Sequence, residues 1–255
     1  MENWLITPGL PKGSVTLCAV TDSPAAEALR NGLQALGIDV VSVPSSTRLP
    51  IPCASHPDVQ LRHLGSDRII VGSEKLCSIL AHYDANAILS KMLPSAPYPK
   101  DIPLNCLLLG DKLFGNLRYT DPAVLEFAAA NKIKTISVPQ GYTRCSVCVA
   151  DQNSIITADA SIKTAAEKEG IEVLHIHPGF ITLPGYDYGF IGGCCGHIGK
   201  NHIAFCGNLS THPDGESIRA FLTKKLIRIT ELPSPDGTLW DIGGIIPLKE
   251  KRSSQ

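Results

Sequence analysis

Residues 21–44 read TDSPAAEALRNGLQALGIDVVSVP, and the same order of features returns three more times along the chain. The other copies span residues 120–139, 157–178 and 210–233. Each copy begins with Thr or Ser near an acidic residue, continues through one amphipathic helix, and ends in a short apolar strand followed by proline. A repeat of this kind indicates a fold assembled from similar units, because one copy cannot bury its apolar face alone.

The acidic residue near the start of each copy is expected to be a helix N-cap. A carboxylate in that position accepts hydrogen bonds from the free backbone amides of the first helical turn. The residues concerned are Asp22, Asp121, Asp159 and Asp214.

A turn rich in Gly, Asp and Asn precedes the helices and predicts a hairpin of two short strands. These turns lie at residues 65–67, 110–112, 151–153 and 199–201. The turn at residues 65–67 begins a less regular copy of the unit. A stretch that looks helical follows at residues 76–93.

The less regular copy brings the number of units to five, provided that residues 13–20 (GSVTLCAV) form the inner strand of the first unit. We expect the tail, residues 237–248, to pair beside that strand and close a ring. The sequence therefore predicts a single α/β domain over residues 1–255, a propeller of five pseudo-repeated strand–helix units. A parallel-sheet α/β sandwich is the alternative, because it gives the same alternation of helix and strand.

Composition and charge limit the classes of partner. The formal net charge of −1 gives no electrostatic reason to expect nucleic acid or an anionic membrane. No apolar run approaches the roughly 20 residues of a spanning helix, and residues 1–14 lack the pattern of a signal peptide. We expect a cytoplasmic protein that needs no cofactor and binds a small molecule, with its nine cysteines present as thiols.

Polar and sulfur-containing residues gather in the segments that follow the closing strands. We call these five segments the returns, because in a ring of such units each one leads back to the central axis. They span residues 52–62, 102–107, 139–149, 178–197 and 233–244. Candidate functional residues are therefore sought in the returns.

The unit pattern, together with GYDYGFIGGCCG at residues 185–196 and AFCGNLSTHPD at residues 204–214, resembles the pentein superfamily of guanidine-modifying enzymes. These two phrases are most similar to a group of bacterial proteins described only by that fold. The resemblance implies five strand–helix blades around a pseudo-fivefold axis. Enzymes of the superfamily cleave a guanidino C–N bond with a nucleophilic cysteine, a histidine for proton transfer, and carboxylates that hold the guanidinium.

The chain departs from the superfamily pattern at two places. The superfamily nucleophile lies near the C-terminus after a glycine run, but the matching residues 241–247 read DIGGIIP, and no cysteine follows Cys206. The His-x-Asp strand of the superfamily is also missing, and the fourth return offers Gly185-Tyr186-Asp187 instead. The usual catalytic site would thus lack its nucleophilic sulfur.

Other residues of the returns are candidates for the same roles. The resemblance implies a cysteine nucleophile, for which the candidates are Cys194 and Cys145, and a proton shuttle, for which the candidate is His56. Candidate substrate-binding residues are Asp58, Arg62, Arg144, Asp187 and Asp241. For Asp58 and Asp241 the alternative is a role as turn caps, and the His-Pro-Asp at residues 212–214 is interpreted as a helix cap.

The cysteines of the returns leave three interpretations open. Cys145 and Cys148 have the spacing of a zinc knuckle or a redox pair, and Cys194, Cys195 and His197 lie in a glycine-rich return. They form a metal site, include a reactive thiol, or pack as inert side chains. Two functions follow from the whole sequence: a hydrolase on a guanidino or amidino C–N bond with an altered site, or a non-catalytic binder of a small ligand on that scaffold.

Overall fold

A unit of two antiparallel strands, a helix and a parallel third strand occurs five times in the fold. The computed structural model describes residues 2–252 of the 255-residue chain. The hairpins pair β18 (Ile246–Lys251) with β2 (Ser14–Thr21), β4 (Leu61–Gly65) with β5 (Arg68–Val71), β7 (Leu107–Leu109) with β8 (Lys112–Gly115), β10 (Val147–Asp151) with β11 (Ser154–Thr157), and β14 (Cys195–Gly199) with β15 (His202–Cys206).

A helix and a third strand complete each unit. The helices are α1 (Glu27–Ala35), α3 (Glu74–Ala81), α4 (Pro122–Ala130), α5 (Ala160–Lys168) and α6 (Gly215–Lys224). The third strands, each parallel to the second strand of its unit, are β3 (Asp39–Val43), β6 (Asn86–Leu89), β9 (Lys134–Ser137), β12 (Glu172–His175) and β16 (Arg228–Leu232). A parallel pair needs a crossover connection, and the helix supplies it.

Short elements connect the units. They are β1 (Glu2–Trp4), which pairs with β18, the helix α2 (Pro57–Gln60), the strands β13 (Ile181–Thr182) and β17 (Leu239–Trp240), which pair with each other, and 3-10 turns at Pro24–Ala26, Ile51–Cys53, Ile191–Cys194 and Leu209–Thr211.

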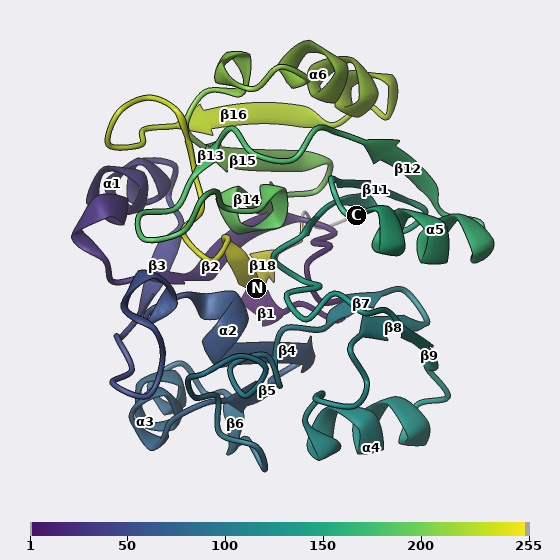
Figure 1. The fold of residues 1–255 in the computed structure, drawn as a ribbon. Helices are drawn as coiled ribbons and strands as arrows, with labels where there is room; N and C mark the ends of the chain where they lie inside the picture. The colour runs from purple at the N-terminus through teal and green to yellow at the C-terminus, as the bar shows by residue number, and fades with distance from the viewer. Residues whose placement is uncertain (1, 253–255) are drawn as a thin grey trace.

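The strands and helices are arranged from the inside outward. Helices α1, α3, α4, α5 and α6 lie at the outside, and the first strands β4, β7, β14 and β18 lie nearer the middle (Figure 1). Burial follows the same order: every residue of β4 and β14 is buried, whereas most residues of the third strands β6, β9 and β12 are exposed or half-buried.

Each outer helix buries the same part of its surface. It places two residues, four positions apart, in the core. These pairs are Leu29 and Leu33, Leu76 and Leu80, Val124 and Ala128, Ile162 and Ala166, and Ile218 and Leu222. Burial of one large aliphatic side chain contributes about 1.5–3 kcal/mol, so the helices depend on the strands beneath them. Within residues 2–252 no helix is long and apolar enough to cross a membrane.

The predicted hairpin turns and the pairing of the tail are confirmed. At the first turn Gly65 and Ser66 both have positive φ, +104° and +52°. A Cβ on Gly65 would lie 2.6 Å from the carbonyl oxygen of Ile6, so only glycine fits there. The tail strand β18 pairs antiparallel with β2, with Ile246 opposite Ala19.

The strand pairing decides between the two predicted architectures. The strands of residues 2–252 form five sheets of two to seven strands, four of which contain antiparallel hairpins, not one parallel sheet. The parallel sandwich is therefore wrong. The predicted long helical stretch after the first turn is also wrong, because α3 ends at Ala81, Asp84 takes a φ of +61°, and β6 follows.

Two of the four predicted N-caps are confirmed. The carboxylate of Asp121 accepts a hydrogen bond from Ala123 N, and that of Asp159 accepts hydrogen bonds from Ser161 N and Ile162 N. Asp22 is not a cap, because the 3-10 turn starting at Pro24 separates it from α1.

Asp214 stands at the N-cap position of α6 but makes no cap hydrogen bond. Its carboxylate accepts a hydrogen bond from His177 N instead, and the Asp214 N–H donates to His212 Nδ1. The helix-cap interpretation of residues 212–214 is therefore wrong, and the Asp214 carboxylate holds the backbone of His177 instead.

Asp121→Ala should destabilise the protein by about 2 kcal/mol, whereas Asp22→Ala should change its stability by less than about 0.5 kcal/mol. The reason is that buried Asp121 accepts hydrogen bonds from Ala123 N, Met92 N and Ser90 Oγ, and Asp22 is exposed. Urea unfolding of both variants measures the difference. Equal losses would contradict this assignment of caps.

Candidate functional site

The returns surround a pocket of about 250 Å³. Its walls come from the first, third, fourth and fifth returns, which are far apart in the sequence. The lining residues are Cys53, His56, Val59, Tyr142, Cys145, Leu183, Tyr186, Asp187, Tyr188, Phe190 and Asp241. We call this the acidic pocket, because Asp187 and Asp241 line it and Asp58 lies directly behind Cys145.

The thiol of Cys145 is held between a carboxylate and an amide. Its Sγ donates a hydrogen bond to Asp58 Oδ2 at 2.8 Å, and Asn105 Nδ2 donates to Sγ at 2.9 Å. Asn105 Oδ1 also accepts from the backbone N–H groups of Arg144 and Cys145, at 2.9 and 3.2 Å. One side chain from the second return therefore fixes both the loop and the position of the sulfur.

Asp58 is buried completely in the first turn of α2. Its Oδ2 accepts the hydrogen bond from the Cys145 thiol, but its Oδ1 is buried without a hydrogen-bond partner. Burying a carboxylate oxygen without a partner is costly, so a donor or a cation placed beside Asp58 would be favourable. The Asp58 backbone is fixed by Gly243 O, which accepts from its N–H at 3.2 Å.

His56 and Asp241 form the second polar pair of the pocket. His56 Nδ1 lies 3.7 Å from Asp241 Oδ1, and both side chains are almost fully buried. The Asp241 carboxylate accepts from the backbone N–H groups of Phe190 at 2.8 Å and Gly243 at 3.0 Å. The turn-cap interpretation of Asp241 therefore fits the structure, and the capped carboxylate still faces the pocket.

Glycine permits these close approaches. A Cβ on Gly193 would lie 2.0 Å from Asp241 Oδ1, and one on Gly243 would lie 2.5 Å from His56 Cβ. Gly243 also has a φ of +74°, which favours glycine. Gly193 in the fourth return and Gly243 in the fifth thus make room for the Asp241 carboxylate and for His56.

Burial controls the protonation of the site. It raises the pKa of Asp58 to about 6; the nearby His56 opposes this change and Asp241 adds to it. Burial, and then the charges of Asp58 and Asp241, raise the pKa of the Cys145 thiol well above its usual value. At neutral pH the pocket therefore holds a neutral thiol next to an ionised carboxylate.

Aromatic side chains form one wall. The ring centroids of Tyr98 and Tyr142 are 5.7 Å apart, those of Tyr142 and Phe190 are 6.1 Å apart, and those of Tyr188 and Phe190 are 6.2 Å apart. Aromatic faces next to carboxylates attract cations, so this wall and the acids favour the same kind of ligand.

Sequence reasoning missed several residues of this site. Asn105 stands in the second return without any motif around it. Cys53 lines the pocket, and burial together with Asp101 raises the pKa of its thiol to about 12. Asp101 itself accepts a hydrogen bond from the Tyr142 hydroxyl. The clustering of polar residues in the returns could have pointed to Asn105 and Cys53, whereas Asp101 lies just outside the second return.

The sequence-predicted residues fall into two groups. Cys145, His56, Asp58 and Asp241 lie together as described, and Asp187 is exposed at the rim of the same pocket. The other three residues, Cys194, Arg62 and Arg144, lie elsewhere.

Cys194 is fully buried in the apolar core, where its Sγ donates to Ile191 O. Arg62 and Arg144 line a different, smaller cavity. The structure therefore does not bring these three residues to the acidic pocket.

The third and fourth returns do meet, through Cys148 and Cys195. Interaction with the Cys195 thiol, together with burial, raises the pKa of Cys148 well above its usual value. Within the described part of the chain, no group of three His, Cys, Asp or Glu side chains could hold a metal ion. The geometry of these cysteines is that of packed thiols.

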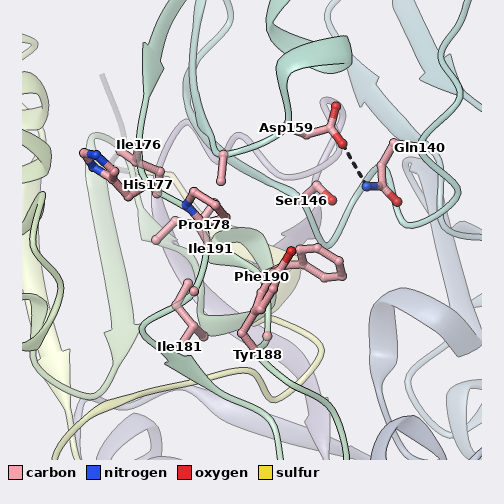
Figure 2. A pocket seen from close by; sticks show the side chains of 13 residues that line it. Gln140, Ser146, Asp159, Ile176, His177, Pro178, Ile181, Tyr188, Phe190 and Ile191 are labelled. Carbon is pink, nitrogen blue, oxygen red and sulfur yellow. Dashed lines mark hydrogen bonds between the residues drawn. The ribbon is translucent and has the colours of Figure 1, made fainter.

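A side pocket of about 80 Å³ adjoins the acidic pocket and shares Tyr188 and Phe190 with it. Figure 2 shows the hydrogen bond from Gln140 to Asp159 in the wall of the side pocket. The His177 ring points away from Phe190. Asp159 is already occupied by its cap hydrogen bonds. The polar groups of the side pocket thus serve the fold, and its aromatic residues support the wall of the acidic pocket.

Solved structures with a similar fold include an amidinotransferase, a dimethylarginine dimethylaminohydrolase and an agmatine deiminase. An inosamine-phosphate amidinotransferase from Streptomyces griseus is 10% identical with a TM-score of 0.60, covering 99% of this chain and 98% of its own. A variant of dimethylarginine dimethylaminohydrolase from Pseudomonas aeruginosa, complexed with citrulline, is 12% identical with a TM-score of 0.53, covering 88% and 96%. An agmatine deiminase from C. jejuni is 8% identical with a TM-score of 0.51, covering 91% of both chains.

These structures have the pentein fold, so the resemblance predicted from the sequence is confirmed: the protein has a mixed α/β fold of the pentein class. The chain belongs to the family described as "Family of unknown function (DUF6873)", which matches residues 20–246. Comparison with curated protein sequences gives no match.

Gly193→Ala should displace the Asp241 carboxylate, because the added Cβ would lie 2.0 Å from its Oδ1. We expect a loss of about 2 kcal/mol in stability, measured by urea unfolding. Gly199→Ala is the matched control, since its nearest atom would be 3.6 Å away. Equal stability of the two variants would contradict the close packing described for Asp241.

Asp58→Asn should stabilise the protein by about 2 kcal/mol more at pH 8 than at pH 4. The pKa of Asp58 rises from 3.8 to about 6 on folding, so the folded state binds more protons than the unfolded state between these values. The wild type therefore loses stability as pH rises from about 4 to about 6, and the variant does not. Unfolding curves across this range test the difference, with exposed Asp39→Asn as control.

Proposed function

We propose that the acidic pocket binds a small cation of the guanidinium or amidinium class and that Cys145 attacks its central carbon, so that a C–N bond is hydrolysed. The observation that carries this proposal is the 2.8 Å hydrogen bond from Cys145 Sγ to Asp58 Oδ2, in a pocket that also contains His56 and Asp241. Nucleophile, proton acceptor and proton donor are thus within one pocket.

Charge supports a cationic ligand. Asp58, Asp241 and Asp187 lie in or at the pocket, and Asp58 Oδ1 lacks a partner. A guanidinium is planar and presents several N–H donors in one plane, which paired carboxylates match well. The wall of Tyr142, Tyr188 and Phe190 would add a cation–π contribution.

The reaction can be written with residues of this pocket. Asp58 accepts the Sγ proton, the sulfur attacks the ligand carbon, and the electron pair of the broken C–N bond leaves with the amine. In this scheme His56, whose Nδ1 lies 3.7 Å from Asp241 Oδ1, gives a proton to the leaving amine. Water then attacks the S-amidino carbon and gives its proton to His56, and the departing sulfur recovers its proton from Asp58.

The ligand would also activate the thiol. The charges of Asp58 and Asp241 disfavour a thiolate in the free protein. A bound cation offsets these charges and lowers the pKa of Cys145. The nucleophile in this proposal comes from the third return, whereas the superfamily position, after the glycine run near the C-terminus, is followed here by Ile245 and Ile246.

The architecture belongs to the same proposal. We infer that the five units close into a five-bladed α/β propeller and that the chain forms a single domain over residues 1–255; residues 1 and 253–255 lie outside the described range. The pairing of β18 with β2 supports closure. A propeller would place the acidic pocket on the central axis, where the superfamily enzymes act.

One observation favours a binder without turnover. Cys145 is only 4% exposed, and burial and two carboxylates keep its thiol neutral. If no ligand reaches the sulfur, the same acids and aromatic rings bind a cation without chemistry.

Calorimetric titration with agmatine, arginine and methylarginines tests the binding. Affinity for at least one of them should rise about tenfold between pH 5 and pH 7.5, because Asp58 ionises with a pKa of about 6. Asp58→Asn should abolish this rise, and Asp39→Asn should retain it. No binding of any of these cations by the wild type would refute the proposal.

Release of ammonia or amine separates the enzyme from the binder. Cys145→Ser should bind the same cation within about threefold and release product at least 100-fold more slowly. Cys194→Ser is the matched control and should retain turnover, because its thiol lies in the core. Binding with no turnover by the wild type would leave the cation binder and reject the hydrolase.

A further inference from the structure

A second cavity, about 40 Å³ in volume, lies among the five first strands. Each of β4, β7, β10, β14 and β18 contributes to its wall. It shares no lining residue with the acidic pocket, and its polar residues are basic rather than acidic. They are Arg62, His63, Arg144 and His197. We call it the basic cavity.

The two arginines have no carboxylate partner. Arg62 is 6% exposed, its Nε donates to Leu104 O at 2.9 Å, and its second terminal nitrogen, Nη2, is buried without any partner. Arg144 Nη1 donates only to backbone oxygens, of Val147 at 3.1 Å and Gly192 at 3.4 Å. Across residues 2–252, no carboxylate oxygen lies within 4.0 Å of any guanidinium nitrogen of Arg62 or Arg144.

Arg62 is a buried cation without a paired counter-ion, which is costly, and the half-buried Arg144 adds a second positive charge to the same cavity. The carboxylate that acts on both of them from a distance is Asp58, and that group already accepts the Cys145 hydrogen bond. Apolar residues such as Leu107, Ile203 and Ile245 form much of the remaining wall. A negative charge inside the basic cavity would therefore be strongly favoured.

The two histidines of the basic cavity add a hydrogen-bonding requirement for a ligand. His63 Nε2 donates to Ser66 O at 2.7 Å, and His197 Nε2 donates to Val149 O at 3.0 Å. Because a carbonyl oxygen can only accept, each Nε2 carries the proton. The Nδ1 atom of each ring is then a lone-pair acceptor, and both are buried without a partner. Burial lowers the pKa of both rings to about 4, so they are neutral at pH 7.

We propose that the basic cavity binds a small protonated oxyanion of the hydrogencarbonate type. Its charged oxygens would accept hydrogen bonds from Arg62 and Arg144, and its O–H group would donate to the free Nδ1 of His63 or His197. A halide offers no donor to these atoms, and a neutral water molecule does not offset the arginines. The small volume excludes large organic anions.

The test measures the melting temperature of the full-length protein at pH 7.5 and constant ionic strength. Sodium gluconate, whose anion is too large for the cavity, is replaced stepwise by sodium hydrogencarbonate or by sodium chloride. Hydrogencarbonate at ten times its dissociation constant should raise the wild-type melting temperature by about 3–5 °C. Chloride should raise it by less than about 1 °C.

Arg62→Met removes the buried guanidinium and should abolish the response to hydrogencarbonate. In gluconate this variant should melt at or above the wild-type temperature, because an unpaired buried cation has been removed. Exposed Arg118→Met is the matched control and should respond like the wild type. Arg62→Lys, which keeps a cation, should retain the fold and respond less than the wild type.

Two results would overturn the proposal. Equal responses of the wild type, Arg62→Met and Arg62→Lys would show that hydrogencarbonate acts elsewhere or not at all. A chloride response as large as that to hydrogencarbonate would show that the cavity does not recognise an O–H group. Neither result bears on the acidic pocket, whose residues are separate, so the proposed function is tested independently.

Discussion

Packing of the five first strands against one another is the constraint on which the other features depend. Every residue of β4 and β14 is buried, and each outer helix adds only one pair of core residues to its unit. A unit alone could not bury its hairpin. Because all units must meet along their first strands, the returns that lead into those strands are brought together, whatever their separation in the sequence.

This convergence explains why side chains of opposite charge line two separate cavities in the same interior. Cys145, just before a first strand, lines the acidic pocket with Asp58 behind it, whereas Arg62 and His197, within first strands, line the basic cavity. Carboxylates and guanidiniums are close enough to influence each other but do not pair directly. Each group remains available for a ligand, at a cost in stability to the free protein.

Much of the fold could be predicted because it is encoded locally. Helix periodicity, Gly/Asp/Asn turns and terminating prolines each depend on a few neighbouring residues. The failures have equally local causes: a 3-10 turn moved the start of α1 away from Asp22, and the positive φ of Asp84 ended a stretch that looked helical.

The candidate site could be predicted only in part. Its location followed from the clustering of polar residues in the returns, and His56, Asp58, Cys145 and Asp241 do lie together. The choice between Cys145 and Cys194 could not be made from sequence, because both stand in polar, glycine-rich or cysteine-rich segments. Only the packing shows that one thiol reaches a carboxylate and the other lies in the core.

The pairing of β18 with β2 has a consequence for biosynthesis. Ile246 stands opposite Ala19, so the hairpin of the first unit joins strands from opposite ends of the chain. While the ribosome makes the protein, β2 and β3 are present long before their antiparallel partner. The hairpins of the other four units join neighbouring strands, so both strands emerge together, whereas the hairpin of the first unit must wait for β18. Contacts of such high sequence separation slow folding, and the emerging N-terminal strand is the segment most in need of protection from aggregation.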